Sequence, residues 1–324
     1  MSRLFLSCRL ALAFGLAFAA MAHAQTFPSK PLKLVVPFGP GGSSDVVARI
    51  VAEGAGEALG QPMLIENVPG AGGNIGTARV VKAAPDGYTL VECTIGTCAI
   101  NPSIYAQTGY DLQKDFAPVF LVGGVMNIFT VHPSMPVKSI GELVAYIKAN
   151  PGKLPVAIGA VGSSNHLTPV WFASIAGLDM LYVPFKGAGD AITALLGGQV
   201  MMFVDNEPSI LPQIKSGKAR PLAVTGPRRS AYLPDVATME ELGYKGFVVE
   251  PWYGFMVPQG SPRAAIERLN AAFNAAIRNP RVKARLEEAG LRLIGGAPER
   301  LGEQIRGESE RWAKVVKANN VKVE

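Results

Sequence analysis

The fold of this chain is decided by one segment, Leu32-Lys33-Leu34-Val35-Val36 followed by Pro37-Phe38-Gly39-Pro40-Gly41-Gly42-Ser43-Ser44-Asp45. The apolar run predicts a buried β-strand, and the glycine-rich turn leads into an amphipathic stretch from about Ser44 to Leu59. A strand, a tight turn and a helix in this order form a βα unit, which is the building block of α/β folds.

Further units of the same kind follow along the chain. Short apolar runs predict strands at 63–66, 88–93, 119–122, 154–158, 180–184, 200–204 and 220–225. Helices are predicted from the capping pair Ser139 and Glu142 to Asn150, and over 166–176 and 188–196. A return strand at 252–257, an N-cap at Ser261 and a last helix that contains Trp312 complete the pattern.

Two successive series of βα units predict two α/β lobes. We expect the first lobe to comprise residues 25–124 plus 247–324, and the second lobe residues 125–246. The chain leaves the first lobe near Gly123 and returns near Glu250 without a Gly/Ser linker. Both connections are therefore expected to be strands, an arrangement that suits a hinge.

The first 24 residues have the pattern of a cleaved secretory signal peptide. Arg3 and Arg9 form a basic leader, an apolar stretch covers 10–21, and Ala22-His23-Ala24 offers a cleavage site before Gln25. The apolar stretch is too short for a membrane-spanning helix, which needs about 20 residues. We therefore expect a soluble, exported protein located in the periplasm.

Composition excludes several classes of function. The formal charge is +6, of which Arg3 and Arg9 contribute two, leaving +4 that is thinly spread. A nucleic-acid surface needs clustered basic residues, so we expect no nucleic-acid partner. The histidines of the mature chain, His132 and His166, lie far apart, so no metal site is expected. No cofactor is expected either, because the glycines at 70–76 do not have the spacing of a dinucleotide fingerprint.

The cysteines of the mature chain, Cys93 and Cys98, flank a strand-to-loop turn. They could form a local disulfide in an oxidising compartment. Two small buried thiols are the simpler interpretation, and we favour it.

Four turns have the chemistry to bind an anion. The first is 38–45, where glycines allow close approach of the backbone and a helix start offers N–H groups. The turn at 160–166 has a similar composition and again joins a strand to a helix. Asn74, in the turn at 68–76, and the hydroxyl segment from Thr94 to Thr97 add further donors. Together these turns predict a cleft that binds a small carboxylate.

A secreted serine hydrolase that uses Ser164 and His166 is the alternative function. It lacks a nucleophile-elbow motif, and Asp205 is the only candidate for an orienting acid. His166 at a helix start is more often a capping or packing residue. Asp205 could instead receive a ligand amine or hold a loop.

Many segments of the mature chain resemble one family, the extracytoplasmic solute-binding receptors of tripartite tricarboxylate transporters, known as the TctC or Bug family. The matching segments include 28–31, 36–45, 66–76, 84–90, 100–102, 114–119, 183–187, 195–200 and 233–236. The resemblance implies a type II periplasmic-binding-protein fold, with two α/β lobes joined by two crossing strands. It also implies that the protein catalyses nothing and delivers a mono- or dicarboxylate or an amino acid to membrane transporter subunits.

The resemblance and the turns together name the expected ligand-binding residues. They are Phe38, Gly41, Gly42, Ser43, Ser44, Asn74, Thr94, Gly96, Thr97, Gly162, Ser163, Ser164, His166 and Asp205. Glu207 and Glu250 depart from the family pattern, and near the cleft they would disfavour a highly charged anion. We expect a monomer, and a sensory receptor of the same fold that feeds a two-component system is a further alternative.

Overall fold

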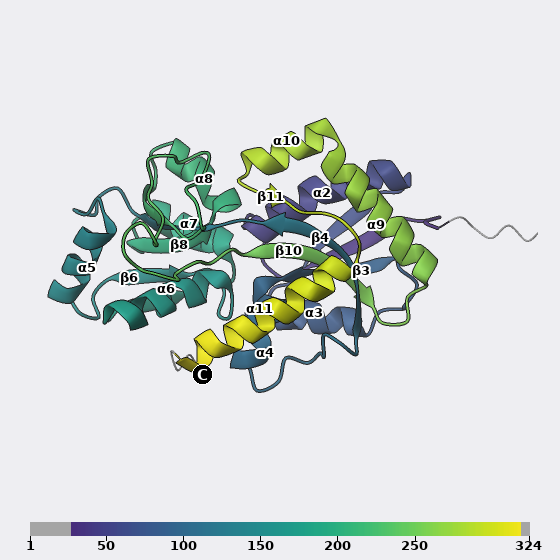
Figure 1. Cartoon of the computed structure of the whole chain (residues 1–324), viewed down its shortest axis with the longest axis horizontal. Helices are drawn as coiled ribbons and strands as arrows, with labels where there is room; N and C mark the ends of the chain where they lie inside the picture. The colour runs from purple at the N-terminus through teal and green to yellow at the C-terminus, as the bar shows by residue number, and fades with distance from the viewer. Residues whose placement is uncertain (1–26, 319–324) are drawn as a thin grey trace, which may run out of the picture.

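The computed structural model describes residues 27–318 and contains two mixed β-sheets surrounded by helices (Figure 1). The six-stranded sheet has the order β11-β4-β10-β3-β1-β2. Its strands are β1 (Leu32–Val36), β2 (Met63–Asn67), β3 (Thr89–Thr94), β4 (Phe116–Gly124), β10 (Trp252–Pro258) and β11 (Arg292–Leu293). The five-stranded sheet has the order β7-β6-β8-β5-β9. Its strands are β5 (Asn127–Val131), β6 (Pro155–Ile158), β7 (Leu181–Pro184), β8 (Met202–Asn206) and β9 (Arg220–Val224).

The helices fill the connections between these strands. They are α2 (Ser43–Leu59), η1 (Ala71–Gly73), α3 (Asn74–Val81), η2 (Gly96–Ile100), α4 (Asn101–Ile104), α5 (Ile140–Ala149), α6 (Ser164–Ala176), α7 (Ala188–Leu196), α8 (Glu207–Lys215), α9 (Arg263–Arg278), α10 (Pro280–Glu288) and α11 (Glu299–Ala318). Within residues 27–318, none of them is long and apolar enough to cross a membrane.

The strand pairing explains why the chain forms two halves. We call them the six-stranded half and the five-stranded half after the sheets that they contain. β1 pairs in parallel with β2 and β3, as βα units require. β10 then inserts antiparallel between β3 and β4, which returns the chain to the six-stranded half after β9. The predicted α/β class and fold are confirmed. The predicted division at 124/125 and 246/247 falls between the sheets, and its meaning as two mobile lobes stays a prediction.

Helix α2 shows how the local sequence determines the buried face of a helix and the residue at which the helix ends. Its buried face includes Val47, Ile50 and Val51, and this face covers the six-stranded sheet beside α9. The helix ends at Gly60, whose backbone is left-handed with φ of 73° and whose N–H donates to the Gly56 carbonyl. Glycine adopts this conformation at little cost, so it stops the helix cleanly.

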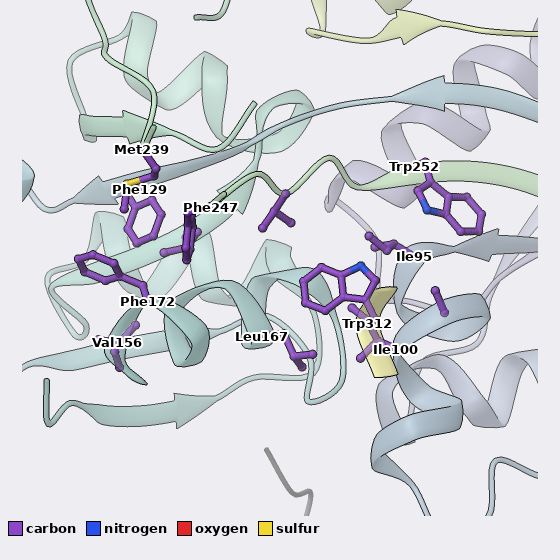
Figure 2. Packing of buried hydrophobic residues seen from close by; sticks show 14 of the residues in the cluster. Ile95, Ile100, Phe129, Val156, Leu167, Phe172, Met239, Phe247, Trp252 and Trp312 are labelled. Carbon is purple, nitrogen blue, oxygen red and sulfur yellow. The ribbon is translucent and has the colours of Figure 1, made fainter. Parts of the chain in front are cut away.

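One hydrophobic core runs through both halves (Figure 2). Helix α11 packs against β4, η2 and α4 of the six-stranded half (Figure 1), and its Trp312 is fully buried. The Trp312 ring meets that of Trp171, on α6 of the five-stranded half, edge to face at 6.2 Å. Burial of large side chains stabilises a fold by roughly 1.5–3 kcal/mol each, so α11 ties the halves together on this side.

Of the local predictions, one is wrong, one is confirmed, and one concerns residues that the structure does not describe. Ser261 is not an N-cap, because its hydroxyl donates to the Pro258 carbonyl and Pro262 occupies the cap position. Ser139 does cap α5, and its Oγ accepts from the Glu142 N–H. The predicted signal peptide, 1–24, lies outside the described residues.

Candidate ligand-binding cavity

A small cavity, here called the central cavity, lies between the two halves. Its volume is about 50 Å³. Its walls come from the starts of α2 and α6, the end of β3, the start of α7 and the strands β8 and β10. The lining residues are Phe38, Gly39, Gly42, Ser43, Ser44, Thr94, Ile95, Gly96, Gly159, Ala160, Ser163, Ser164, Asn165, Ala188, Asp205, Asn206, Pro251, Trp252 and Tyr253.

The structure brings together most of the residues that the sequence singled out. Those that line the central cavity are Phe38, Gly42, Ser43, Ser44, Thr94, Gly96, Ser163, Ser164 and Asp205. Gly41, Asn74, Thr97, Gly162 and His166 do not line it. Residues far apart in the chain therefore meet at one hollow, and their role in binding stays a prediction.

Four of the five residues that do not line the cavity make hydrogen bonds next to its wall. The Gly41 N–H donates to the Asp45 carboxylate at 3.1 Å, which fixes the turn before α2. The Thr97 hydroxyl accepts from the Thr94 N–H at 3.1 Å. The Gly162 N–H donates to His166 Nδ1 at 3.2 Å.

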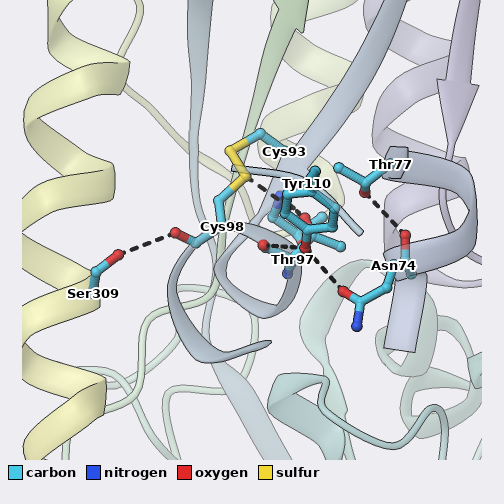
Figure 3. Close-up of a disulfide and its surroundings, with 9 residues drawn as sticks. Asn74, Thr77, Cys93, Thr97, Cys98, Tyr110 and Ser309 are labelled. Carbon is cyan, nitrogen blue, oxygen red and sulfur yellow. Dashed lines mark hydrogen bonds between the residues drawn. A yellow bond between two sulfur atoms is a disulfide. The ribbon is translucent and has the colours of Figure 1, made fainter. Parts of the chain in front are cut away.

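Asn74 was expected among the ligand-binding residues, but it does not line the central cavity. It is buried in the six-stranded half, where its Oδ1 accepts from Asn101 Nδ2 at 2.7 Å and from the Tyr110 hydroxyl at 2.9 Å. Tyr110 also donates to the Thr97 carbonyl (Figure 3). Asn74 therefore belongs to a network that supports the turn from Thr94 to Thr97.

Two helix starts from opposite halves point their polar groups at the central cavity. The N-cap positions of α2 and α6 are Gly42 and Ser163, and neither has a side-chain capping hydrogen bond. The first N–H groups of a helix have no partner within the helix and carry partial positive charge. This arrangement favours an anionic ligand between the two helices.

Hydrogen bonds join the halves directly beside the cavity. The Ser43 hydroxyl lies 2.7 Å from that of Ser209, and Ser209 donates to the Asp205 carboxylate at 2.5 Å. Asn206 Nδ2 donates to the Tyr253 hydroxyl at 3.1 Å. The cavity is therefore held in a closed arrangement by polar contacts between the halves.

The ionisable groups near the cavity carry little charge. Burial raises the pKa of Asp205 to about 6, despite donors from Ser209 and Asn165. Glu92 lies fully buried on β3, and desolvation raises its pKa well above the usual range, which favours its neutral form. Desolvation lowers the pKa of His166 to about 4, so its ring is neutral at pH 7. An anion in the cavity thus meets at most one negative charge in the wall.

The hydrogen bonds do not form a hydrolytic triad. The Ser164 hydroxyl donates to Asn206 Oδ1 at 3.3 Å, and His166 Nδ1 accepts from a backbone N–H. The Asp205 carboxylate accepts from Asn165 and Ser209. A nucleophile, a base and an orienting acid must share hydrogen bonds in sequence, and these three residues do not.

Sequence reasoning missed several residues of the cavity wall. Trp252 and Tyr253 were assigned to a strand without a role in the site, and Asn165, Asn206 and Ala188 were not singled out. Trp252 is 1% exposed, and its indole Nε1–H has no partner among the described residues. A buried donor without an acceptor is costly, so a ligand acceptor would satisfy it. Asn165 directly follows the predicted Ser163 and Ser164, which was the available signal.

The favoured interpretation of the cysteines was wrong. Cys93 and Cys98 form a disulfide (Figure 3), and both are fully buried. The bond closes the loop that contains Thr94, Ile95 and Gly96, all of which line the central cavity. Two separate buried thiols had been favoured as the simpler interpretation, but the turn of the chain from β3 into η2 brings the two sulfurs together.

Glu207 and Glu250 do not line the central cavity. Both line a separate cavity of about 690 Å³ between α8, α10 and the connections of the two halves. Glu207 accepts from the Ser230 hydroxyl, and burial raises its pKa to about 7. Glu250 lies 3.5 Å from Arg292. The expected repulsion of a highly charged anion therefore lacks its structural basis. Within residues 27–318, no group of three or more His, Cys, Asp or Glu side chains is placed to bind a metal.

Comparison with known proteins supports the resemblance seen in the sequence. The model of the tripartite tricarboxylate transporter family receptor, TctC, matches residues 47–321. The structure of the periplasmic binding protein BugD is 35% identical, covers 92% of this chain and 100% of its own, and superposes with a TM-score of 0.89.

Two further solved structures hold ligands. Rpa4515 of R. palustris, solved with adipate, is 34% identical, with 91% of this chain and 99% of that chain covered and a TM-score of 0.88. MatC of Rhodopseudomonas palustris, with bound malate, is 33% identical, with 90% and 100% covered and a TM-score of 0.86.

Proposed function

Because the chain belongs to the tripartite tricarboxylate transporter receptor family, we propose that it captures a small carboxylate in the periplasm and delivers it to a tripartite membrane transporter. The family consists of solute receptors and not enzymes. The solved relatives support a carboxylate, since one binds adipate and another malate.

One observation carries the proposal: two helix starts without side-chain caps, from opposite halves, meet at one cavity that is lined by serine residues. Backbone N–H groups at helix starts supply donors to a carboxylate without the desolvation cost of a buried cation. The unpaired Trp252 N–H adds another donor in the same wall. We infer that the ligand's carboxylate lies between Ser44 and Ser163.

The location and partner follow from the same family. The leader pattern of residues 1–24 supports export, and the named relative BugD is a periplasmic binding protein. The transporter subunits are expected to bind the receptor transiently, with the receptor as a monomer. Loss of carboxylate uptake in a host strain that lacks this gene, restored by the intact gene, would support this delivery role.

Ligand binding is tested by the stability of the mature protein. A ligand that binds only the folded state stabilises it by about 2.7 kcal/mol at a hundredfold excess over the Kd. We expect adipate or malate to raise the melting temperature in a thermal-shift assay, and the corresponding diamides to leave it unchanged. If no small carboxylate raises the melting temperature, the proposed ligand class is wrong.

A further inference from the structure

A second hollow, here called the outer groove, lies beside the central cavity and also between the halves. Its volume is about 290 Å³. The six-stranded half contributes the turn 70–73 and Tyr105, and the five-stranded half contributes Val161, Phe185 and Lys186. Phe38 and Ala160 line both hollows, so the two share a wall.

The two hollows differ in charge. Asp205 is the only acidic or basic residue that lines the central cavity among the described residues, whereas Lys186 is the only one that lines the outer groove. Lys186 is exposed and forms no ion pair with another described residue. Its ammonium group therefore has no competing carboxylate among the described residues.

Residues of both halves line the outer groove, so its shape depends on the contact between the halves. The Tyr105 hydroxyl donates to the Val161 carbonyl at 3.1 Å across the interface. Gly72 has φ of 64°, and a Cβ there would lie 2.3 Å from the Val161 oxygen, so only glycine allows this approach. The rings of Phe38 and Phe185 give the groove an apolar wall that suits methylene groups.

The size of the central cavity limits what it can hold. A cavity needs about 10–15 Å³ per water, so 50 Å³ has room for about four water-sized groups. A carboxylate and the carbons next to it would fill that space. The remainder of a longer ligand would lie in the outer groove.

On the basis of the proposed function, we propose that the outer groove is a second anion subsite and that the ligand is a linear dicarboxylate spanning both hollows. The first carboxylate binds at the two helix starts. The methylene chain passes Phe38, and the second carboxylate binds the Lys186 ammonium. Lys186 is thus the residue that distinguishes dicarboxylates from monocarboxylates.

Titration calorimetry with length-matched ligands tests this proposal. Adipate and hexanoate have the same carbon chain and differ in the second carboxylate. We expect Lys186→Met to weaken adipate binding about tenfold, in line with the loss of one charge-assisted contact, and to leave hexanoate binding within about twofold. Lys186→Arg keeps the charge and is expected to retain most of the adipate affinity.

A matched control and three contrary outcomes make the result decisive. Lys153→Met removes an exposed lysine of the same half that lines neither hollow, and it is expected to change neither affinity. An equal loss for both ligands in Lys186→Met, or unchanged adipate binding, would overturn the subsite. Failure of the unmodified protein to bind adipate would also overturn the subsite, whereas the proposed function itself would fail only if no small carboxylate were bound.

Discussion

We expect the side chain of Asp205 to make the proposed carboxylate binding dependent on pH. Its pKa of about 6 means that it loses its proton just below neutral pH. A bound carboxylate disfavours the ionised form, so the complex takes up a proton and its affinity is highest below pH 6. We expect the adipate affinity, measured by calorimetry, to fall as the pH rises from about 5.5 to about 8, by at most about tenfold per pH unit.

Two comparisons test whether Asp205 is the cause of this pH dependence. Asp205→Asn cannot ionise and keeps one of the two oxygens that accept from Asn165 and Ser209, so its affinity should be lower overall but vary little with pH. An amino-acid ligand would show the opposite trend, because its ammonium group prefers ionised Asp205. A ligand affinity that rises with pH would therefore contradict the proposal that the ligand is a dicarboxylate.

At the scale of elements, the disulfide fixes the loop between β3 and η2. Closing a loop of this length stabilises a protein by about 2 kcal/mol on the chain-entropy view. We expect the double change Cys93→Ala and Cys98→Ala to lower the free energy of unfolding in urea by about this amount. It should also weaken ligand binding several-fold, because Thr94 and Gly96 in the cavity wall gain freedom.

The variant Thr97→Val tests the position of the loop separately from the disulfide. It removes the hydroxyl that accepts from the Thr94 N–H and leaves the disulfide intact. If loop position matters for binding, this variant also weakens it. Unchanged affinity in both variants would show that the loop does not contribute to ligand binding.

Elements with local signals were predicted well from the sequence. The helix predicted at 188–196 is α7, because glycines flank an amphipathic run on both sides. Strand β5, Asn127–Val131, was missed, because only two residues separate it from the end of β4 at Gly124 and it is not set off as a separate apolar run. The cavity roles of Trp252 and Tyr253 depend on β10 lying between β3 and β4, a pairing that no local pattern specifies.

At the scale of the whole molecule, backbone contacts between two turns define the closed arrangement. A Cβ on Gly187 would lie 3.4 Å from the Gly39 backbone, and one on Gly42 3.2 Å from the Ala188 side chain. The turn before α2 thus packs directly on the start of α7 in the other half (Figure 1). If the halves are lobes that open and close, these glycines allow the closed state to form around the ligand.

Gly189→Ala tests this motion, because a Cβ at Gly189 would lie 2.6 Å from the Pro40 carbonyl oxygen of the other half. Gly189 is in α7, so alanine should stabilise the helix by about 0.5–1 kcal/mol while preventing full closure. We expect unchanged or higher melting temperature without ligand, at least about tenfold weaker adipate binding, and no compaction by adipate in small-angle X-ray scattering. Gly307→Ala, in α11 with no atom within 4 Å of the new Cβ, is the matched control and should bind normally. Full affinity in Gly189→Ala would show that binding does not require the halves to meet at this contact, since an added methyl group at that position cannot coexist with it.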